Sequence, residues 1–325
     1  MRISVIATVL NERESIGALL DSLAAQTCPP DEIVIVDGGS ADGTMDVISE
    51  RLEKLPLKLL FCRGANISQG RNLAIQNATG EIIASTDAGT RLAPEWLAEL
   101  AAPIERGEAK VTAGFFLPDS RSVFEMALGV TTLPELRDVK PGKFMPSSRS
   151  VAFLRSAWEA VGGYPEWLDY CEDLIFDFAL DERFGPFAFA PGALAHFRPR
   201  PTLRAFAKQY YRYARGDGKA DVWRKRQAAR YGTYLVAAPL IFVGGLLVHP
   251  AVWLLYLLGA AVMLRTPYRR LIPKLRGLPW SEQLKALAWV PVIRGMGDWA
   301  KMIGYPVGVR WRLTHRESIP PHPRR

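Results

Sequence analysis

The chain has 325 residues, 49% of them hydrophobic and 23% charged, which is ordinary for a folded protein and leaves room for one large domain or two smaller ones. Its formal net charge is +8, and the basic excess lies from Arg198 onward on both sides of an apolar stretch, which favours an anionic membrane surface over nucleic acid as a partner. Three scattered cysteines argue against a disulfide framework and indicate reduced thiols in the cytosol, and no signal peptide is expected at Met1.

Short β-rich runs alternate with helical patterns in the first half of the chain. Strands are expected at Ile3–Leu10, Glu32–Asp37, Leu57–Cys62, Ile82–Asp87 and Lys110–Phe116. Helices are expected at about Ser15–Ala25, Thr44–Leu52, Ser68–Asn77 and Pro94–Glu105. This alternation predicts an α/β fold, a mostly parallel sheet flanked by helices on both faces. Because right-handed crossovers align the carboxyl ends of such strands, Asn11, Glu12, Asp37 and Asp87 are expected at one edge of the sheet.

The apolar strand that ends at Asp37 runs into a glycine-rich turn. Its carboxylate can accept hydrogen bonds from a base or ribose, while Gly38, Gly39 and Gly43 let the backbone approach a ligand closely. Asp and Gly are also favoured in an ordinary β-α turn. This segment alone therefore leaves a nucleotide pocket and a plain turn equally open.

The pattern becomes mixed after Ser147. A short strand is expected at Ser150–Leu154, then a helix that ends at Gly162 and Gly163, and then a helix that starts near Glu172. A basic amphipathic segment, Thr202–Arg230, follows.

Residues 231–264 contain no Lys, Arg, Asp or Glu, and His249 and Pro250 divide them near the middle. A spanning helix needs about 20 apolar residues, so two short helices joined at this point are expected to form a membrane hairpin. Basic residues flank both ends, which by the positive-inside rule places both ends in the cytoplasm. One tilted span, a re-entrant hairpin in one leaflet and a buried pair of core helices are the alternatives.

A last apolar stretch, Ala286–Val309, is interrupted by Arg294, Asp298 and Lys301 and contains several aromatic residues. This mixture is typical of an interfacial helix rather than of a third span. The proline- and arginine-rich tail beyond Arg316 is expected to be disordered.

Seven motifs follow one another over residues 1 to about 216. They are Thr8–Glu12, Val36–Ser40 with Asp42–Thr44, Gly70–Asn72, Thr86–Gly89, Gly162–Tyr164, Glu172-Asp173, and Gln209 with Arg212-Tyr213. Each is weak alone, but in this order the chain resembles the family 2 glycosyltransferases, inverting enzymes of GT-A fold. The expected domains are then a GT-A domain at 1–216, a basic juxtamembrane segment at 217–230, a transmembrane or re-entrant hairpin at 231–264, basic and amphipathic interfacial helices at 265–316, and a disordered tail at 317–325.

The resemblance implies a nucleoside-diphosphate sugar as donor, with Asp37 holding the base. The donor-nucleotide site is expected to contain Thr8, Asn11, Glu12, Asp37, Gly39, Arg71, Asp87 and Ala88. Arg71 and Asn72 open a helix, where a guanidinium and backbone amides can hold a nucleotide. A surface salt bridge and a helix cap are the alternative roles of these two residues.

Asp87 stands where the family has its acidic metal motif, so a divalent cation, Mg²⁺ or Mn²⁺, is implied there. The chain departs from the family pattern because Gly89 replaces the second acidic residue, which puts metal dependence in doubt. Arg91 is near enough to supply positive charge instead. His196 is a candidate second metal ligand, although a lone histidine is more often structural.

The family resemblance assigns the catalytic base to Asp173, with Glu172 orienting it or the acceptor. Two acids at a helix N-terminus also stabilise the helix dipole, which is the alternative role. The acceptor and diphosphate site is expected to contain Gly163, Tyr164, Gln209, Arg212 and Tyr213. Tyr213 stands where processive polysaccharide synthases have Trp, and only one apolar hairpin follows, so a single-addition transferase is favoured over a polymer-secreting synthase.

We therefore expect an inverting glycosyltransferase that moves a sugar from a nucleoside-diphosphate sugar to a lipid-linked or glycan acceptor. It is expected at the cytoplasmic face of the inner membrane, in contact with lipid and not with nucleic acid, in cell-surface polysaccharide or glycolipid synthesis. A nucleotidyltransferase would need a basic glycine-rich loop where Asn11–Glu14 is acidic. A non-catalytic sugar-nucleotide-binding scaffold is the remaining alternative, and Gly89 is the feature that supports it.

Overall fold

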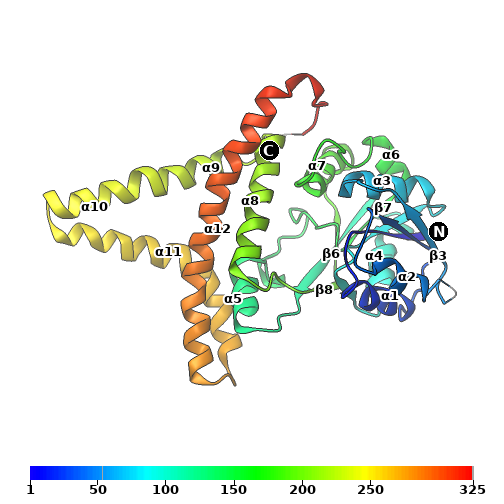
Figure 1. The fold of residues 1–325 in the computed structure, drawn as a ribbon, viewed down its shortest axis with the longest axis horizontal. Helices are drawn as coiled ribbons and strands as arrows, with labels where there is room; N and C mark the ends of the chain where they lie inside the picture. The colour runs from blue at the N-terminus through cyan, green and yellow to red at the C-terminus, as the bar shows by residue number, and fades with distance from the viewer. Residues whose placement is uncertain (53, 324–325) are drawn as a thin grey trace. The chain divides into compact units, whose positions relative to one another are not determined.

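The computed structural model describes residues 1–52 and 54–323. Their contacts divide the chain into two compact units, both drawn in Figure 1. The sheet unit comprises residues 1–119, 136–198 and 321–323, and the helical unit comprises residues 120–135 and 199–320. The expected domain boundary at residue 216 falls inside helix α8 (Leu203–Ala220), which belongs as a whole to the helical unit, as does the unexpected helix α5 (Val123–Thr132).

The sheet unit is built on one eight-stranded mixed sheet. Its strands are β1 (Ile3–Val9), β2 (Glu32–Asp37), β3 (Leu57–Phe61), β4 (Ile82–Ser85), β5 (Thr90–Leu92), β6 (Val111–Pro118), β7 (Val151–Leu154) and β8 (Ala188–Phe197). Their order is β3-β2-β1-β4-β7-β6-β8-β5. The pairs β3-β2, β2-β1, β1-β4 and β6-β8 are parallel, whereas β7 runs antiparallel to β4 and β6, and β5 to β8.

Helices cover both faces of this sheet, as predicted. They are α1 (Ile16–Ala24), α2 (Thr44–Ser49), α3 (Ile67–Asn77), α4 (Trp96–Glu105), α6 (Arg155–Ala160) and α7 (Glu172–Phe184), with a 3₁₀ turn at Leu136–Asp138. Successive strand residues point to opposite faces. Val5 of β1 accordingly joins a buried cluster with Leu19 of α1 and Trp96 of α4, while its neighbour Ile6 joins a second cluster with Ile75 of α3 and Phe176 of α7.

The carboxyl ends of β1, β2 and β4 meet at one edge, which positions Asn11 and Glu12, Asp37, and Asp87 as expected. Strand β4 ends at Ser85, two residues before the expected end. The reason is a turn in which the amide and the hydroxyl of Thr90 donate to the carbonyl of Asp87, at 3.2 and 2.7 Å.

The helical unit consists of helices and their connections. Besides α5 and α8 it contains α9 (Arg224–Tyr231), a π-helical segment (Gly232–Ala237), α10 (Ala238–Leu247), α11 (Leu254–Leu271) and α12 (Trp280–Thr314), with 3₁₀ turns at Pro250–Trp253, Ile272–Leu275 and Arg316–Ser318. The expected interfacial stretch Ala286–Val309 lies inside α12. The tail expected to be disordered is described to residue 323, where the His322 ring lies 5.0 Å from that of Trp167; residues 324–325 are outside the described part.

Helices α8 and α12 lie side by side and run parallel. Glycines at their interface let the two backbones come close together. A Cβ at Gly304 would collide with the carbonyl oxygen of Tyr211, and one at Gly308 with that of Arg215. A Cβ at Gly218 of α8 would likewise collide with the carbonyl oxygen of Tyr305. Any larger side chain at these positions would force the two helices apart.

Residues 224–247 and 250–275 form the two arms of a hairpin that runs across the direction of α12 in Figure 1. Both are long and apolar enough to cross a membrane, and only 6% of the apolar window of each is buried. The hairpin turns at His249 and Pro250, as expected. Large apolar side chains such as Leu247 (80% exposed) and Val248 (79% exposed) stand free of the fold, so the alternative of a buried core helix pair is wrong.

Candidate active site at the carboxyl edge of the sheet

Asp37 is completely buried at the end of β2 and its carboxylate holds the following turn. It accepts hydrogen bonds from the amides of Gly39 and Ser40 at 2.9 and 3.0 Å and from the Ser40 hydroxyl at 2.5 Å. The backbone amide of Asn11 donates to the Ser40 hydroxyl (2.8 Å), and the side-chain oxygen of Asn11 accepts from the amide of Ala41 (2.9 Å). The structure thus brings Asn11, Asp37 and Gly39 together, and Asp37 shapes the turn as well as lying at its base.

Arg71 of α3 occupies the centre of the site. Its side chain is 3% exposed and donates from Nη2 to Oδ1 of Asp87 (2.8 Å) and from Nη1 to Oε1 of Glu172 (2.9 Å). Burial opposes its charge, but the nearby Asp87, Tyr164 and Glu172 raise the pKa of the guanidinium above its usual value. The alternative of a surface salt bridge is therefore wrong for Arg71, because it joins two carboxylates from segments far apart in the chain.

Arg149 is a second cation at Asp87 that sequence reasoning missed. Its Nε lies 3.3 Å from Oδ2 of Asp87, and its guanidinium carbon lies 4.5 Å from the centre of the Phe197 ring. Asp87 is therefore contacted by a guanidinium on each carboxylate oxygen while its side chain stays 27% exposed. No residue pattern in the sequence connects Arg149 with Asp87, since the loop before β7 brings it there.

The acidic pair Glu172-Asp173 begins α7. Burial and the neighbouring Asp173 raise the pKa of Glu172 to about 7, although Arg71 works in the opposite direction. Asp173 is half-buried, and its Oδ1 accepts a hydrogen bond from the amide of Leu174 at 2.8 Å. The pair thus contains one buried carboxyl held by Arg71 and one more accessible carboxyl group. Both lie in the first turn of α7, where the helix dipole of the alternative role also favours acidic groups.

Asn72 acts as a structural clamp. Its Nδ2 donates to the carbonyl oxygen of Tyr164 (2.9 Å) and to Oε1 of Glu166 (2.9 Å), and its Oδ1 accepts from the amide of Tyr164 (2.9 Å). Gly163 has φ +80, and a Cβ there would lie 2.8 Å from Oδ1 of Asn72. The helix-cap alternative for Asn72 is wrong, because Asn66 caps α3.

Tyr164 was expected to contact the acceptor, but the structure buries it. Its side chain is 1% exposed, its ring stacks on that of Phe176 (4.0 Å between centroids), and the Arg71 guanidinium lies 5.2 Å above it. Tyr164 therefore supports Arg71 from the core instead of presenting a surface to an acceptor. Gly163 positions this loop.

Thr8, Ala88 and Glu12 lie around the same edge. Thr8 packs against α3 so closely that a Cβ at Gly70 would lie 2.6 Å from its methyl group. Ala88 is buried. The Glu12 carboxylate accepts from the Ser15 hydroxyl, and its Oε2 lies 3.9 Å from where a Cβ of Gly89 would be. A carboxylate therefore stands beside the position that lacks one.

His196 lies inside β8, in register with Arg91 of β5 and with Leu117 of β6. Burial and the charge of Arg91 lower the pKa of its imidazole. Within residues 1–52 and 54–323, no group of three or more His, Cys, Asp or Glu side chains could hold a metal ion. Asp87, and Glu12 beside Gly89, offer oxygen donors of the kind that Mg²⁺ and Mn²⁺ prefer. A cation at Asp87 would compete with Arg71 and Arg149 for its carboxylate.

Asp177, one turn beyond Asp173 on α7, was also missed by sequence reasoning. It is 2% exposed, and its Oδ2 has no hydrogen-bond partner among the described residues. Burial and the charge of Asp173 raise the pKa of this carboxyl well above its usual range. Its surroundings therefore favour the protonated form of the carboxyl behind Asp173.

Gln209, Arg212 and Tyr213 belong to α8 in the helical unit. Nε2 of Gln209 donates to the Tyr213 hydroxyl at 2.7 Å. Their expected role at the acceptor and diphosphate stays a prediction.

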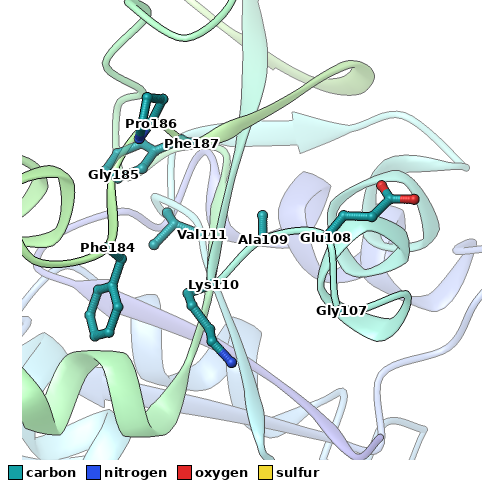
Figure 2. Close-up of a pocket in the computed structure, with 9 residues that line it drawn as sticks. All are labelled: Gly107, Glu108, Ala109, Lys110, Val111, Phe184, Gly185, Pro186 and Phe187. Atoms are coloured by element: carbon teal, nitrogen blue, oxygen red, sulfur yellow. The ribbon is translucent and has the colours of Figure 1, made fainter.

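A hollow of about 430 Å³, open to solvent, lies elsewhere on the sheet unit (Figure 2). Its walls are residues 107–111, which lead into β6, and residues 184–187, which lead into β8. Strand β7 runs antiparallel to both β4 and β6, so β6 and its parallel neighbour β8 run in the same direction as β4. The residues that lead into β6 and β8 therefore lie at the amino edge of the sheet. The hollow is thus at the opposite edge from Asp37 and Asp87.

Comparisons with known proteins agree with this architecture. The profile of "Glycosyl transferase family 2" matches residues 4–159, and that of "Glycosyl transferase family group 2" matches residues 82–298. An uncharacterized glycosyltransferase of Nostoc sp. is 41% identical over 27% of this chain, a match that spans only 28% of that relative's length. The succinoglycan biosynthesis protein ExoA of Rhizobium meliloti is 28% identical over 81% of this chain and 87% of its own length.

Among solved structures, a mannosyltransferase of Pyrobaculum calidifontis in complex with GDP-Man and Mn²⁺ is similar in fold, with a TM-score of 0.58 and 20% identity over 96% of this chain and 87% of that one. This likeness confirms the predicted GT-A fold. The two family profiles confirm the prediction of a transferase enzyme at the level of the family. Since the family group profile covers most of the chain, this protein belongs to family 2 of the glycosyltransferases.

Proposed function

We propose that this protein is an inverting glycosyltransferase that moves a sugar from a nucleoside-diphosphate sugar to a lipid-linked or glycan acceptor at the cytoplasmic face of the inner membrane. The observation that carries the proposal is the bridge made by Arg71. One buried guanidinium joins Asp87, on the donor side, to Glu172, beside the proposed base. The bridge supports the proposal because it would hold the donor and the acceptor chemistry in one arrangement.

Inverting transfer is a single in-line displacement. The acceptor hydroxyl oxygen forms the new bond to the anomeric carbon, the bond from that carbon to the diphosphate oxygen breaks, and the hydroxyl proton passes to the base. Asp173 fits this role because it is half-buried and its Oδ2 makes no hydrogen bond to any residue in the described part of the chain. Glu172, bound to Arg71, positions the start of α7 and with it Asp173.

The leaving diphosphate carries negative charge that the site must offset. Arg71 and Arg149 converge on Asp87 at 2.8 and 3.3 Å and supply two positive charges there. A divalent cation held by Asp87 would add Lewis-acid stabilisation of the departing diphosphate. The Mn²⁺ and GDP-Man in the structurally similar mannosyltransferase support a cation and a nucleotide sugar as ligands of this fold.

Membrane attachment is proposed for the hairpin of residues 224–275. Its arms expose large apolar side chains between Leu235 and Val262, for example Leu240, Leu246 and Leu257 at 60% or more. Arg224–Arg226 precede the apolar run and Arg269-Arg270 follow it, which favours a cytoplasmic location for both ends. A role in polysaccharide synthesis is supported by the likeness to ExoA, a succinoglycan biosynthesis protein.

Two measurements on the detergent-purified full-length chain test the proposal. Thermal stabilisation by UDP, GDP, CDP and dTDP, each with Mg²⁺, Mn²⁺ or EDTA, identifies the donor class and the need for a metal. Asp173→Asn is then expected to slow transfer by about 10²–10⁴-fold while donor affinity by calorimetry is unchanged. Asp181→Asn on the same helix is the matched control. Normal turnover in Asp173→Asn would remove Asp173 as the base, and no stabilisation by any nucleotide would contradict a nucleotide-sugar donor.

A further inference from the structure

A cluster of charged side chains lies in the helical unit where the hairpin meets α12. Asp298 of α12 is 6% exposed and accepts from Nε of Arg230 (2.7 Å) and from the Tyr234 hydroxyl (3.1 Å). Nε of Arg294, one turn earlier on α12, lies 3.4 Å from the other oxygen of the same carboxylate. Two guanidinium groups thus share one buried carboxylate, which leaves positive charge in excess.

Lys301 adds a third cation on the same face of α12. Its Nζ lies 4.6 Å from the centre of the Tyr210 ring and forms no ion pair with a carboxylate among the residues that the structure describes. Burial and the charge of Arg230 lower the pKa of this amine, and the carboxylates of Asp217 and Asp298 only partly compensate. The cluster therefore has three cations around the buried carboxylate of Asp298, with one amine resting on an aromatic face.

The distance from this cluster to the tip of the hairpin indicates how deep the cluster would lie in a membrane. From Arg230 to the turn at His249 the first arm contains about 18 residues, or roughly 27 Å of helix at 1.5 Å per residue. This is close to the hydrocarbon thickness of about 30 Å. If the tip reaches one surface of the bilayer, Arg230 and Asp298 lie at the headgroup level of the other, where the chain meets lipid phosphates.

We propose that Arg294, Lys301 and Arg230 form a binding site for the phosphate group of an anionic lipid. The inference rests on the membrane attachment proposed above but not on sugar transfer. Two guanidinium groups and an ammonium around one carboxylate suit a phosphate, which accepts several charge-assisted hydrogen bonds. Both a bulk phospholipid and a lipid-linked acceptor carry this group. The Tyr231 hydroxyl donates to the carbonyl of Met302 (2.7 Å) and so fixes the first arm on α12 beside the site. The π-helical segment begins directly after Tyr231.

The test measures lipid binding without any donor sugar, so that its result is independent of catalysis. Phosphatidic acid, a polyprenyl phosphate, phosphatidylcholine and inorganic phosphate are titrated into the detergent-purified full-length chain, and bound lipid is counted by native mass spectrometry. The wild-type chain is expected to retain the two phosphate-monoester lipids over phosphatidylcholine. Lys301→Gln and Arg294→Gln should each weaken their binding about tenfold or more, while Lys301→Arg retains it.

Lys285→Gln is the matched control, because Lys285 is an exposed cation on the same helix outside the cluster. A preference for polyprenyl phosphate would identify an acceptor carrier as the source, and equal binding of phosphatidic acid would identify bulk lipid; both support the site. Unchanged binding in both Gln variants, or losses as large in Lys285→Gln, would overturn it. Complete competition by inorganic phosphate at equal concentration would overturn the assignment to lipid.

Discussion

Arg71→Met tests whether one guanidinium couples the two carboxylates of the proposed active site. Arg71 is 3% exposed and contacts Asp87 and Glu172 at 2.8 and 2.9 Å. Removing one partner of a buried ion pair costs about 3–5 kcal/mol. Because Asp87 keeps Arg149 as a partner, we expect a loss at the lower end, about 3 kcal/mol of unfolding free energy at neutral pH.

The loss should depend on pH because the pKa of Glu172 is raised from 4.5 to about 7 in the folded protein. A raised carboxyl pKa means that the folded state favours the protonated form of Glu172. The stability that protonated Glu172 contributes to the folded state is therefore complete below pH 4.5 and is lost as the pH rises through 7. Without Arg71 this pKa rises further, so the variant continues to lose about 1.4 kcal/mol per pH unit above 7, where the wild-type curve levels off. The difference between the two proteins should therefore be constant below pH 7 and grow above it.

Chemical unfolding of the full-length chain in detergent, followed by near-UV circular dichroism at about pH 6, 7 and 8.5, measures this difference. Glu172→Gln provides the reference background, since the amide that replaces the carboxyl group carries no charge at any pH. In that background Arg71→Met should cost less and should lose the extra pH dependence above 7. Losses that agree within about 0.5 kcal/mol in the two backgrounds at every pH would refute the coupling.

Three further substitutions follow from the structure. Asp37→Ala removes the acceptor of three hydrogen bonds in the nucleotide turn, and calorimetry should show donor-nucleotide affinity reduced about tenfold or more. Asp42→Ala, which leaves the Asp37 carboxylate in place, should not reduce this affinity. Equal affinities of the two variants would exclude Asp37 from the pocket. Gly89→Asp adds a carboxylate at a position where a Cβ meets, among the described residues, only Oε2 of Glu12, at 3.9 Å. Mn²⁺ binding, measured by electron paramagnetic resonance, should therefore tighten, and weaker binding would contradict a cation at Asp87. Gly304→Ala should destabilise the helical unit by about 1–3 kcal/mol because its methyl group meets the Tyr211 carbonyl. Gly295→Ala on the same helix has open space and should be neutral or stabilising. Equal thermal shifts in the two variants would mean that α8 and α12 are not closely packed.

The sequence alone predicted the parts of the fold that depend on local patterns. Strands β1 to β4 and their intervening helices were found because alternation of apolar runs and helical periodicity is a property of short windows. The edge that holds Asp37 and Asp87 followed from the handedness of the crossovers. The hairpin turn at His249 and Pro250 followed from composition and from proline.

Local patterns located β6 and β7 but not β5 and β8, and they did not show how these four strands pair. Strand β7 lies antiparallel between β4 and β6, and β5 pairs with β8 more than 100 residues away. The choice among such partners depends on which apolar faces become covered when the whole chain folds. The same holds for α5, which leaves the alternating pattern to join the helical unit.

The sequence likewise predicted which acidic residues belong to the site, but only the tertiary structure decided how they are held. The side chains of Arg71 and Glu172 are 101 residues apart in the chain and 2.9 Å apart in space. Arg149 and Asp177 carry no local signal, and Tyr164 was expected to face an acceptor but supports Arg71 from the core. Residue identity and spacing determine what each strand end can offer. Burial and long-range ion pairing, which exist only in the folded chain, determine how the carboxyl groups of the site are held and that the pKa of Glu172 is raised.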